Sequence, residues 1–101
     1  MSKDKGPDTK IIKELILEAG RDAAASVDGV FRVLDIKTDP DTDKKTCEID
    51  VYIEATYGYK IPAVSWDIQS AVKARVKTAS QYDADKIDIH IQGVGKENTE
   101  V

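Results

Sequence analysis

TCEIDVYIEA, residues 46–55, is the stretch of sequence that decides the fold. Its apolar side chains recur at every second position, which is the spacing of a β-strand with one buried side and one open side. The side expected to be buried carries Cys47, Ile49, Val51 and Ile53. The side expected to be open carries Glu48, Asp50, Tyr52 and Glu54.

Two further segments are predicted to be strands. Residues 30–37 are rich in β-branched and aromatic side chains, and the polar connection 39–43 should join them to the central strand as a hairpin. Residues 86–92 alternate in the same way, with isoleucines on one side and Asp88, His90 and Gln92 on the other. The alternation leaves open which edge of the hairpin the last strand joins.

Two amphipathic helices are predicted, over about residues 9–26 and from about Pro62 to Ser80. Asp8 or Thr9 can cap the first helix, and turns are expected at Asp28-Gly29 and over residues 57–60. The apolar positions of the first helix are Ile12, Leu15, Ile16, Ala19, Ala23 and Val27. Those sharing one face of the second are Val64, Ile68, Ala71, Val72, Arg75 and Ala79, with Val76 beside them.

The order αββαβ predicts an α+β, two-layer domain, in which a three-stranded sheet has both helices packed on one face. We expect a leader over residues 1–8, a single domain over 9–95 and a polar tail over 96–101. The uncovered face should carry Tyr52, His90 and Gln92, with Phe31 and Val33 beside them. Such a mixed aromatic and polar face suits protein contacts, and self-association through this face or a sheet edge competes with a merely solvated face.

Composition narrows the classes of function. The net charge of −4 argues against nucleic-acid binding, which requires a basic patch. The chain has neither a membrane-spanning apolar run nor a signal peptide, so we expect no direct membrane insertion. The single cysteine, Cys47, permits no internal disulfide, which suits a reducing cytoplasm.

Motifs for catalysis fail one by one. Cys47 and His90 fall on opposite sides of the predicted sheet, so they cannot form a catalytic pair. Asp39, Asp41 and Asp43 resemble the start of a calcium loop, but Lys44 stands where that loop needs glycine. We therefore expect no catalytic residue, no metal site and no cofactor.

Trp66 lies on the polar side of the second helix, with Gln69, Ser70, Lys73 and Lys77. An exposed tryptophan there is typical of a contact anchor. The competing interpretation is that the tail or the loop over residues 57–60 folds over it.

Several motifs resemble the alkaline-shock protein family of bacterial envelope-stress proteins, over roughly residues 11–95. They are Ala23-Ala24-x-Ser26-Val27-x-Gly29-Val30, Tyr57-Gly58-x-x-Ile61-Pro62, Ile68-Gln69-x-x-Val72-Lys73, and IHIQGV at residues 89–94. At the matching positions, Gly58 and Pro62 are expected to shape the turn into the second helix, and Gly93 to end the last strand. The sequence departs from the family pattern at Ala63, where an acidic residue is common, and at Gln81, where glycine is common.

The resemblance implies a small, non-catalytic cytoplasmic protein that self-associates. It also implies a role in envelope stress or in envelope and fatty-acid homeostasis. The implied partners are a second copy of the chain, a membrane-anchoring protein that places it at the membrane surface, or a regulated enzyme. The alternative function is a small RNA-binding-like module, because αββαβ also occurs among RNA-binding folds.

Overall fold

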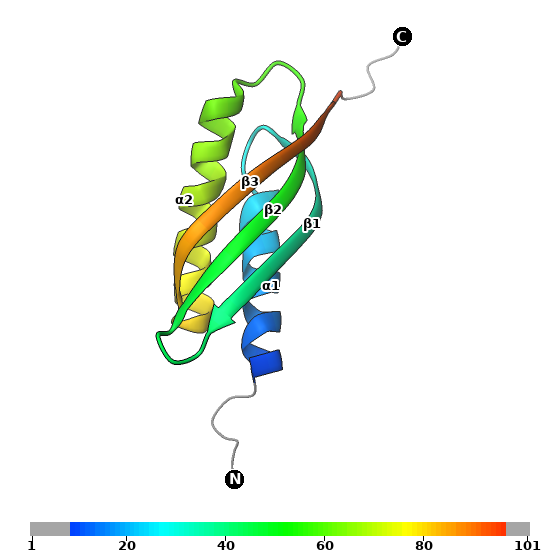
Figure 1. Ribbon diagram of the computed structural model, residues 1–101. Helices are drawn as coiled ribbons and strands as arrows, with labels where there is room; N and C mark the ends of the chain where they lie inside the picture. The colour runs from blue at the N-terminus through cyan, green and yellow to red at the C-terminus, as the bar shows by residue number, and fades with distance from the viewer. Residues whose placement is uncertain (1–8, 97–101) are drawn as a thin grey trace.

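The computed structural model describes residues 9–96, so the expected leader and residues 97–101 of the expected tail lie outside the described residues. Two helices lie side by side on one face of a three-stranded sheet (Figure 1). The elements are α1 Thr9–Ala25, β1 Val30–Asp41, β2 Thr46–Thr56, α2 Ile61–Ser80 and β3 Asp83–Gly95. The predicted α+β order αββαβ is confirmed.

β2 is the central strand of the sheet, whose order is β1-β2-β3. β1 pairs with it antiparallel as the predicted hairpin, and β3 pairs with it parallel on the other side. Parallel neighbours need a crossover connection between them, and α2 is that crossover. The position of β3, which the alternation left open, therefore follows from packing α2 against the sheet.

The core lies between the sheet and the helices. Ile49, Val51 and Ile53 of β2 are at most 1% exposed, and they pack against helix residues such as Ile16 and Ile68. This confirms the side of β2 that was predicted to be buried. The line of α2 that faces the sheet is Val64, Ile68, Val72 and Val76.

Three positions placed on the predicted apolar faces are exposed, namely Arg75 and Ala79 of α2 and Leu15 of α1. On α2 the buried positions follow a spacing of four residues, so Val76 lies on the buried side and Arg75 and Ala79 do not. On α1, Leu15 is 38% exposed because Ile12, Ile16 and Ala19 take the places against the sheet.

The strands are longer than predicted. β1 continues through the polar residues to Asp41, because Asp39 and Asp41 stay in register with Glu48 and Thr46. β3 begins at Asp83 and continues to Gly95, so the expectation that Gly93 ends it was wrong. Backbone pairing with a central strand holds these ends extended although their side chains are polar.

The turn from β2 into α2 contains two of the residues at which the family resemblance was seen. Gly58 has a φ of 94° and Pro62 lies in the first helical turn. At the other end of α2, Gln81 takes the left-handed conformation with a φ of 69°, and its N–H donates to the Lys77 carbonyl at 2.9 Å.

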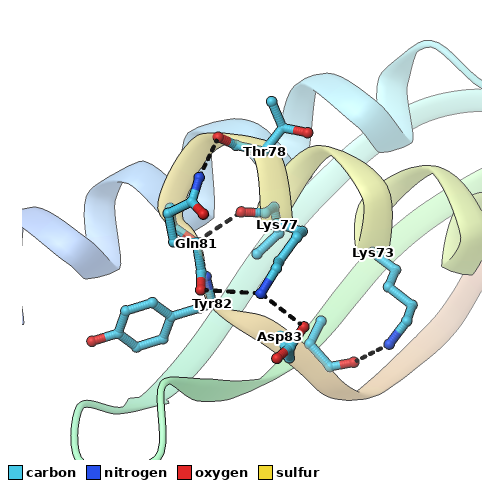
Figure 2. A network of polar contacts seen from close by, with 9 residues as sticks. Lys73, Lys77, Thr78, Gln81, Tyr82 and Asp83 are labelled. Carbon is cyan, nitrogen blue, oxygen red and sulfur yellow. Dashed lines mark hydrogen bonds and ion pairs between the residues drawn. The ribbon is translucent and has the colours of Figure 1, made fainter.

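A network of polar contacts surrounds that helix end (Figure 2). Lys77 Nζ lies 3.5 Å from the Gln81 carbonyl oxygen and 3.3 Å from Asp83 Oδ1. The Gln81 side chain lies at 3.5 Å from the Thr78 carbonyl. These contacts offset the cost of about 1–2 kcal/mol that a residue with a Cβ has in this conformation, so glutamine serves where glycine is usual.

Gly29 and Gly58 form a matched pair for testing how closely the turn between α1 and β1 packs against α2. Both have a φ of 94°, but a Cβ on Gly29 would lie 2.6 Å from Val64 Cγ2, whereas a Cβ on Gly58 would meet nothing within 4 Å. We expect Gly58→Ala to lower the free energy of unfolding by about 1–2 kcal/mol. Gly29→Ala should cost about 1–3 kcal/mol more, because it also crowds the core.

Urea denaturation of both variants measures the difference. Equal losses for the two variants would contradict the close packing of Gly29 against α2.

Candidate interaction surface on the open face of the sheet

The face of the sheet away from the helices is built around one aromatic pair. Register pairing places Tyr52 of β2 beside His90 of β3, and their rings stack with centroids 4.4 Å apart and planes 12° apart. Lys37 of β1 reaches the same place, with its Nζ 5.4 Å from the Tyr52 ring centroid. All three strands thus contribute to one contiguous group of side chains.

A carboxylate holds the imidazole in place. His90 Nε2 lies 2.9 Å from Asp50 Oδ1, and the two side chains are 37% and 40% exposed. An ionised carboxylate only accepts hydrogen bonds, so Nε2 carries the hydrogen and donates it. Asp50 therefore sets the orientation of a ring that also stacks on Tyr52.

Further charged groups surround this pair. Arg32 Nε donates to Glu54 Oε1 at 2.8 Å. Gln92 is exposed and has no direct partner on β2, because the register shifts between the pairs Ile53↔Ile91 and Glu54↔Gly93. Gly93 itself has room for a Cβ, whose nearest neighbour would be the Glu54 side chain at 3.8 Å.

Two register shifts in β1 change which of its side chains reach the open face. Phe31 and Leu34 are the extra residues, and they are 39% and 42% exposed. Val33 pairs with Ile53 and packs against the core, so its expected place on the open face was wrong. A β-bulge re-aims the side chains that follow it, and the alternation of the sequence gives no sign of one. The Phe31 ring instead crosses toward β3, where it lies against Gly95.

Trp66 lies apart from Tyr52, His90 and Gln92. It is on α2 and is 68% exposed, so the loop over residues 57–60 does not cover it. It lines a shallow hollow of about 240 Å³ between α2 and β3. The other lining residues are Gln69, Ser70, Lys73, Ala84, Asp85 and Ile87. The four predicted contact residues therefore belong to two separate places.

Sequence reasoning missed Lys37 and Asp50 as parts of the surface. Asp50 shares the open side of β2 with Tyr52, so the alternation contained its signal. Lys37 could not be found in that way, since its contact with Tyr52 depends on the register between β1 and β2.

The structure also places Cys47 and the aspartate-rich connection between β1 and β2. Cys47 is buried on the helix side of the sheet, opposite the face that carries His90. Burial raises the pKa of the Cys47 thiol, and the nearby charge of Asp85 acts in the same direction. Asp41 Oδ1 accepts hydrogen bonds from the N–H groups of Asp43 and Lys44, which makes it a turn residue. Within residues 9–96, no group of three or more potential metal ligands occurs.

These features define a small two-layer α+β domain with one uncovered sheet face. The model of the alkaline-shock protein 23 family, a family with a cell envelope-related function, matches residues 35–96. Because this is more than half of the chain, the chain belongs to that family, and the resemblance seen in the motifs is confirmed.

Among curated proteins, an uncharacterised protein of Streptococcus pyogenes, Spy1535, is 36% identical over 50 residues. The match covers 50% of this chain and 39% of that protein, so the chain matches well under half of its relative's length.

Two solved nickel forms of the MamM CTD, each with one substitution, have TM-scores of 0.55 and 0.54 to this chain, at 16% and 17% identity. They cover 79% and 83% of this chain, and 96% and 98% of their own. At this low sequence identity, the similarity shows a shared fold and nothing more.

Neither helix in the described part of the chain is both long enough and apolar enough to cross a membrane.

The Tyr52–His90 stack should couple the two residues energetically. In a double-mutant cycle with Tyr52→Ala and His90→Ala, we expect a coupling of about 0.5–1 kcal/mol in the free energy of unfolding. Thr78, on the outer side of α2, is the matched control, because Tyr52→Ala and Thr78→Ala should add within about 0.5 kcal/mol. Additivity of both pairs in urea denaturation would show that the stack does not persist in solution.

The Cys47 thiol should be unreactive in the folded protein. Only the thiolate attacks an aromatic disulfide reagent, and burial both raises the thiol pKa and blocks access. We expect no reaction at pH 8 over an hour in buffer and complete reaction within minutes in 6 M guanidinium. Rapid labelling of the folded chain would contradict the burial of Cys47.

Proposed function

We propose that this protein is a non-catalytic, self-associating binding protein that acts in the bacterial envelope stress response or in envelope and fatty-acid homeostasis. It works in the cytoplasm, or at the membrane surface through an anchoring partner. Its partners are other copies of itself and a protein that it anchors to or regulates. Membership of a family with a cell envelope-related function supports the setting.

The observation that carries the proposal is the pre-ordered open face. Tyr52, His90 and Asp50 hold one another through a stack and a hydrogen bond, so little side-chain freedom remains to be lost when a partner covers them. Ordered aromatic side chains ringed by polar groups are typical of the centres of protein interfaces. Gln92, exposed beside this group, adds hydrogen-bonding capacity at its rim.

Nucleic-acid recognition is the weaker alternative. RNA-binding sheets stack bases on exposed aromatic rings, whereas here Tyr52 and His90 cover one face of each other's ring. The carboxylates of Asp50, Glu54 and Asp88 on the same face oppose a phosphate backbone, and the net charge of −4 acts in the same direction.

The double variant Tyr52→Asp, His90→Asp tests the open face. It adds two carboxylates to the centre of the surface, where burial against a partner costs several kcal/mol per unpaired charge. We expect the assembled mass seen by light scattering to fall, while the far-ultraviolet circular dichroism of the domain is kept.

The matched control is Ala74→Asp, Thr78→Asp, which adds carboxylates at two exposed positions of α2. It should leave the assembled mass unchanged. An assembled mass that the sheet variant leaves unchanged, or that falls equally with the control, would show that the open face is not a contact surface.

A further inference from the structure

The two edges of the sheet differ in how they are protected from pairing with another strand. β1 has two register shifts, at Phe31 and Leu34, and Pro40 provides no N–H. The Asp35 carboxylate also accepts a hydrogen bond from the Ile36 N–H at 2.9 Å. Bulges, proline and edge charges are the usual means of preventing strand addition, so β1 is a protected edge.

β3 is protected at one end only. Gln69 Nε2 donates to the Ile87 carbonyl at 2.9 Å, and Lys73 Nζ lies 3.5 Å from the Ala84 carbonyl. Because the Ile87 carbonyl accepts from a side chain of α2, it points to the outer edge of the sheet, away from β2. Because backbone groups alternate between the two edges of a strand, those of Ile89 and Ile91 point outward too. No side chain among residues 9–96 hydrogen-bonds to the backbone of Ile89 or Ile91.

The segment from Ile87 to Ile91 is regular, since the register shifts of β3 lie outside it. Its three isoleucines are half-buried and pack against the core from one side. Half-exposed isoleucines along an edge with free backbone groups are the features of a strand that pairs with another chain.

We propose that two copies of this protein pair through β3, antiparallel, about a two-fold axis at Ile89, to form a continuous six-stranded sheet. The inference rests on the proposed self-association and specifies the surface for one of its contacts. Ile87 then lies opposite Ile91 of the second copy, and Ile89 lies opposite Ile89. Asp88 lies opposite His90, so no two groups of like charge face each other in this segment.

Charge and isoleucine pairing select this register over its neighbours. Only shifts by two residues keep the isoleucines on one face. An axis at Asp88 would place two carboxylates directly opposite each other, and like charges opposite each other destabilise a strand pair. An axis at His90 would place Ile87 opposite Gly93 instead of an isoleucine. The axis at Ile89 avoids both.

The pairing also accounts for Trp66. Its side chain borders the hollow beside Ile87, and it is the only tryptophan of the chain. A second β3 at this edge would cover the hollow, so Trp66 would pack against the isoleucines of the incoming strand. The Gln69 amide would release the Ile87 carbonyl, which would instead accept from the Ile91 N–H of the second copy.

A dilution series of the full chain tests this pairing, with sedimentation velocity and Trp66 fluorescence measured on the same samples. We expect Trp66 emission to shift to the red and iodide quenching to rise about threefold as the dimer dissociates. In the dimer, amide exchange at Ile89 and Ile91 should slow at least tenfold.

His90→Glu should weaken the dimer about five- to tenfold, because it places a carboxylate opposite Asp88 twice in the pair. Thr78→Glu, which adds the same charge at an exposed position of α2, is the matched control and should leave the dissociation constant within twofold. Both positions are outside the core, so the variants should keep the fold.

Association with unchanged Trp66 fluorescence and fast exchange at Ile89 would overturn the β3 pairing while leaving self-association intact. A monomer at every concentration up to about 1 mM would overturn both. Equal weakening by His90→Glu and Thr78→Glu would also refute the β3 edge, since it would show a general effect of charge.

Discussion

Burial of one side of β2 beneath both helices is the constraint on which the rest of the structure depends. A central strand with Ile49, Val51 and Ile53 fully buried needs cover from more than one helix, and α1 and α2 lie side by side to provide it. Burying side chains of this size stabilises the fold by about 1.5–3 kcal/mol each. Since both helices are used on one face, the opposite face has no cover from the described part of the chain.

The uncovered face is ordered by contacts between strands. Tyr52 stacks on His90, Asp50 fixes the imidazole, and Lys37 lies over the phenol ring. Each contact joins neighbouring strands, so the face keeps its shape only while the three strands stay in register. A surface held in this way presents aromatic rings to a partner without first having to order them, which is the physical basis for assigning it a binding role.

Much of this arrangement could be predicted from periodicity. The two-residue alternation of β2 and β3 placed Cys47 in the core and His90 on the other side, and the structure agrees. The helix ends were predicted to within one residue, but the strand ends were not. Asp39 and Asp41 are held in a strand by their partners on β2, where a contact outside the local sequence outweighs the local preference. At Gln81, contacts with Lys77 and Thr78 in the same turn let glutamine close α2 in a conformation that favours glycine.

The sequence by itself determined the order of elements, the buried side of each long strand and the family, because these depend on spacing and on motifs within short segments. Only the tertiary structure decided the neighbours of each strand, the shifts at Phe31 and Leu34 that turn Val33 inward, and the separation of Trp66 from the Tyr52–His90 pair. These features depend on register between strands and on how α2 lies along β3. These contacts join residues about 20 to 40 positions apart in the chain, so the alternation within a single segment cannot predict them.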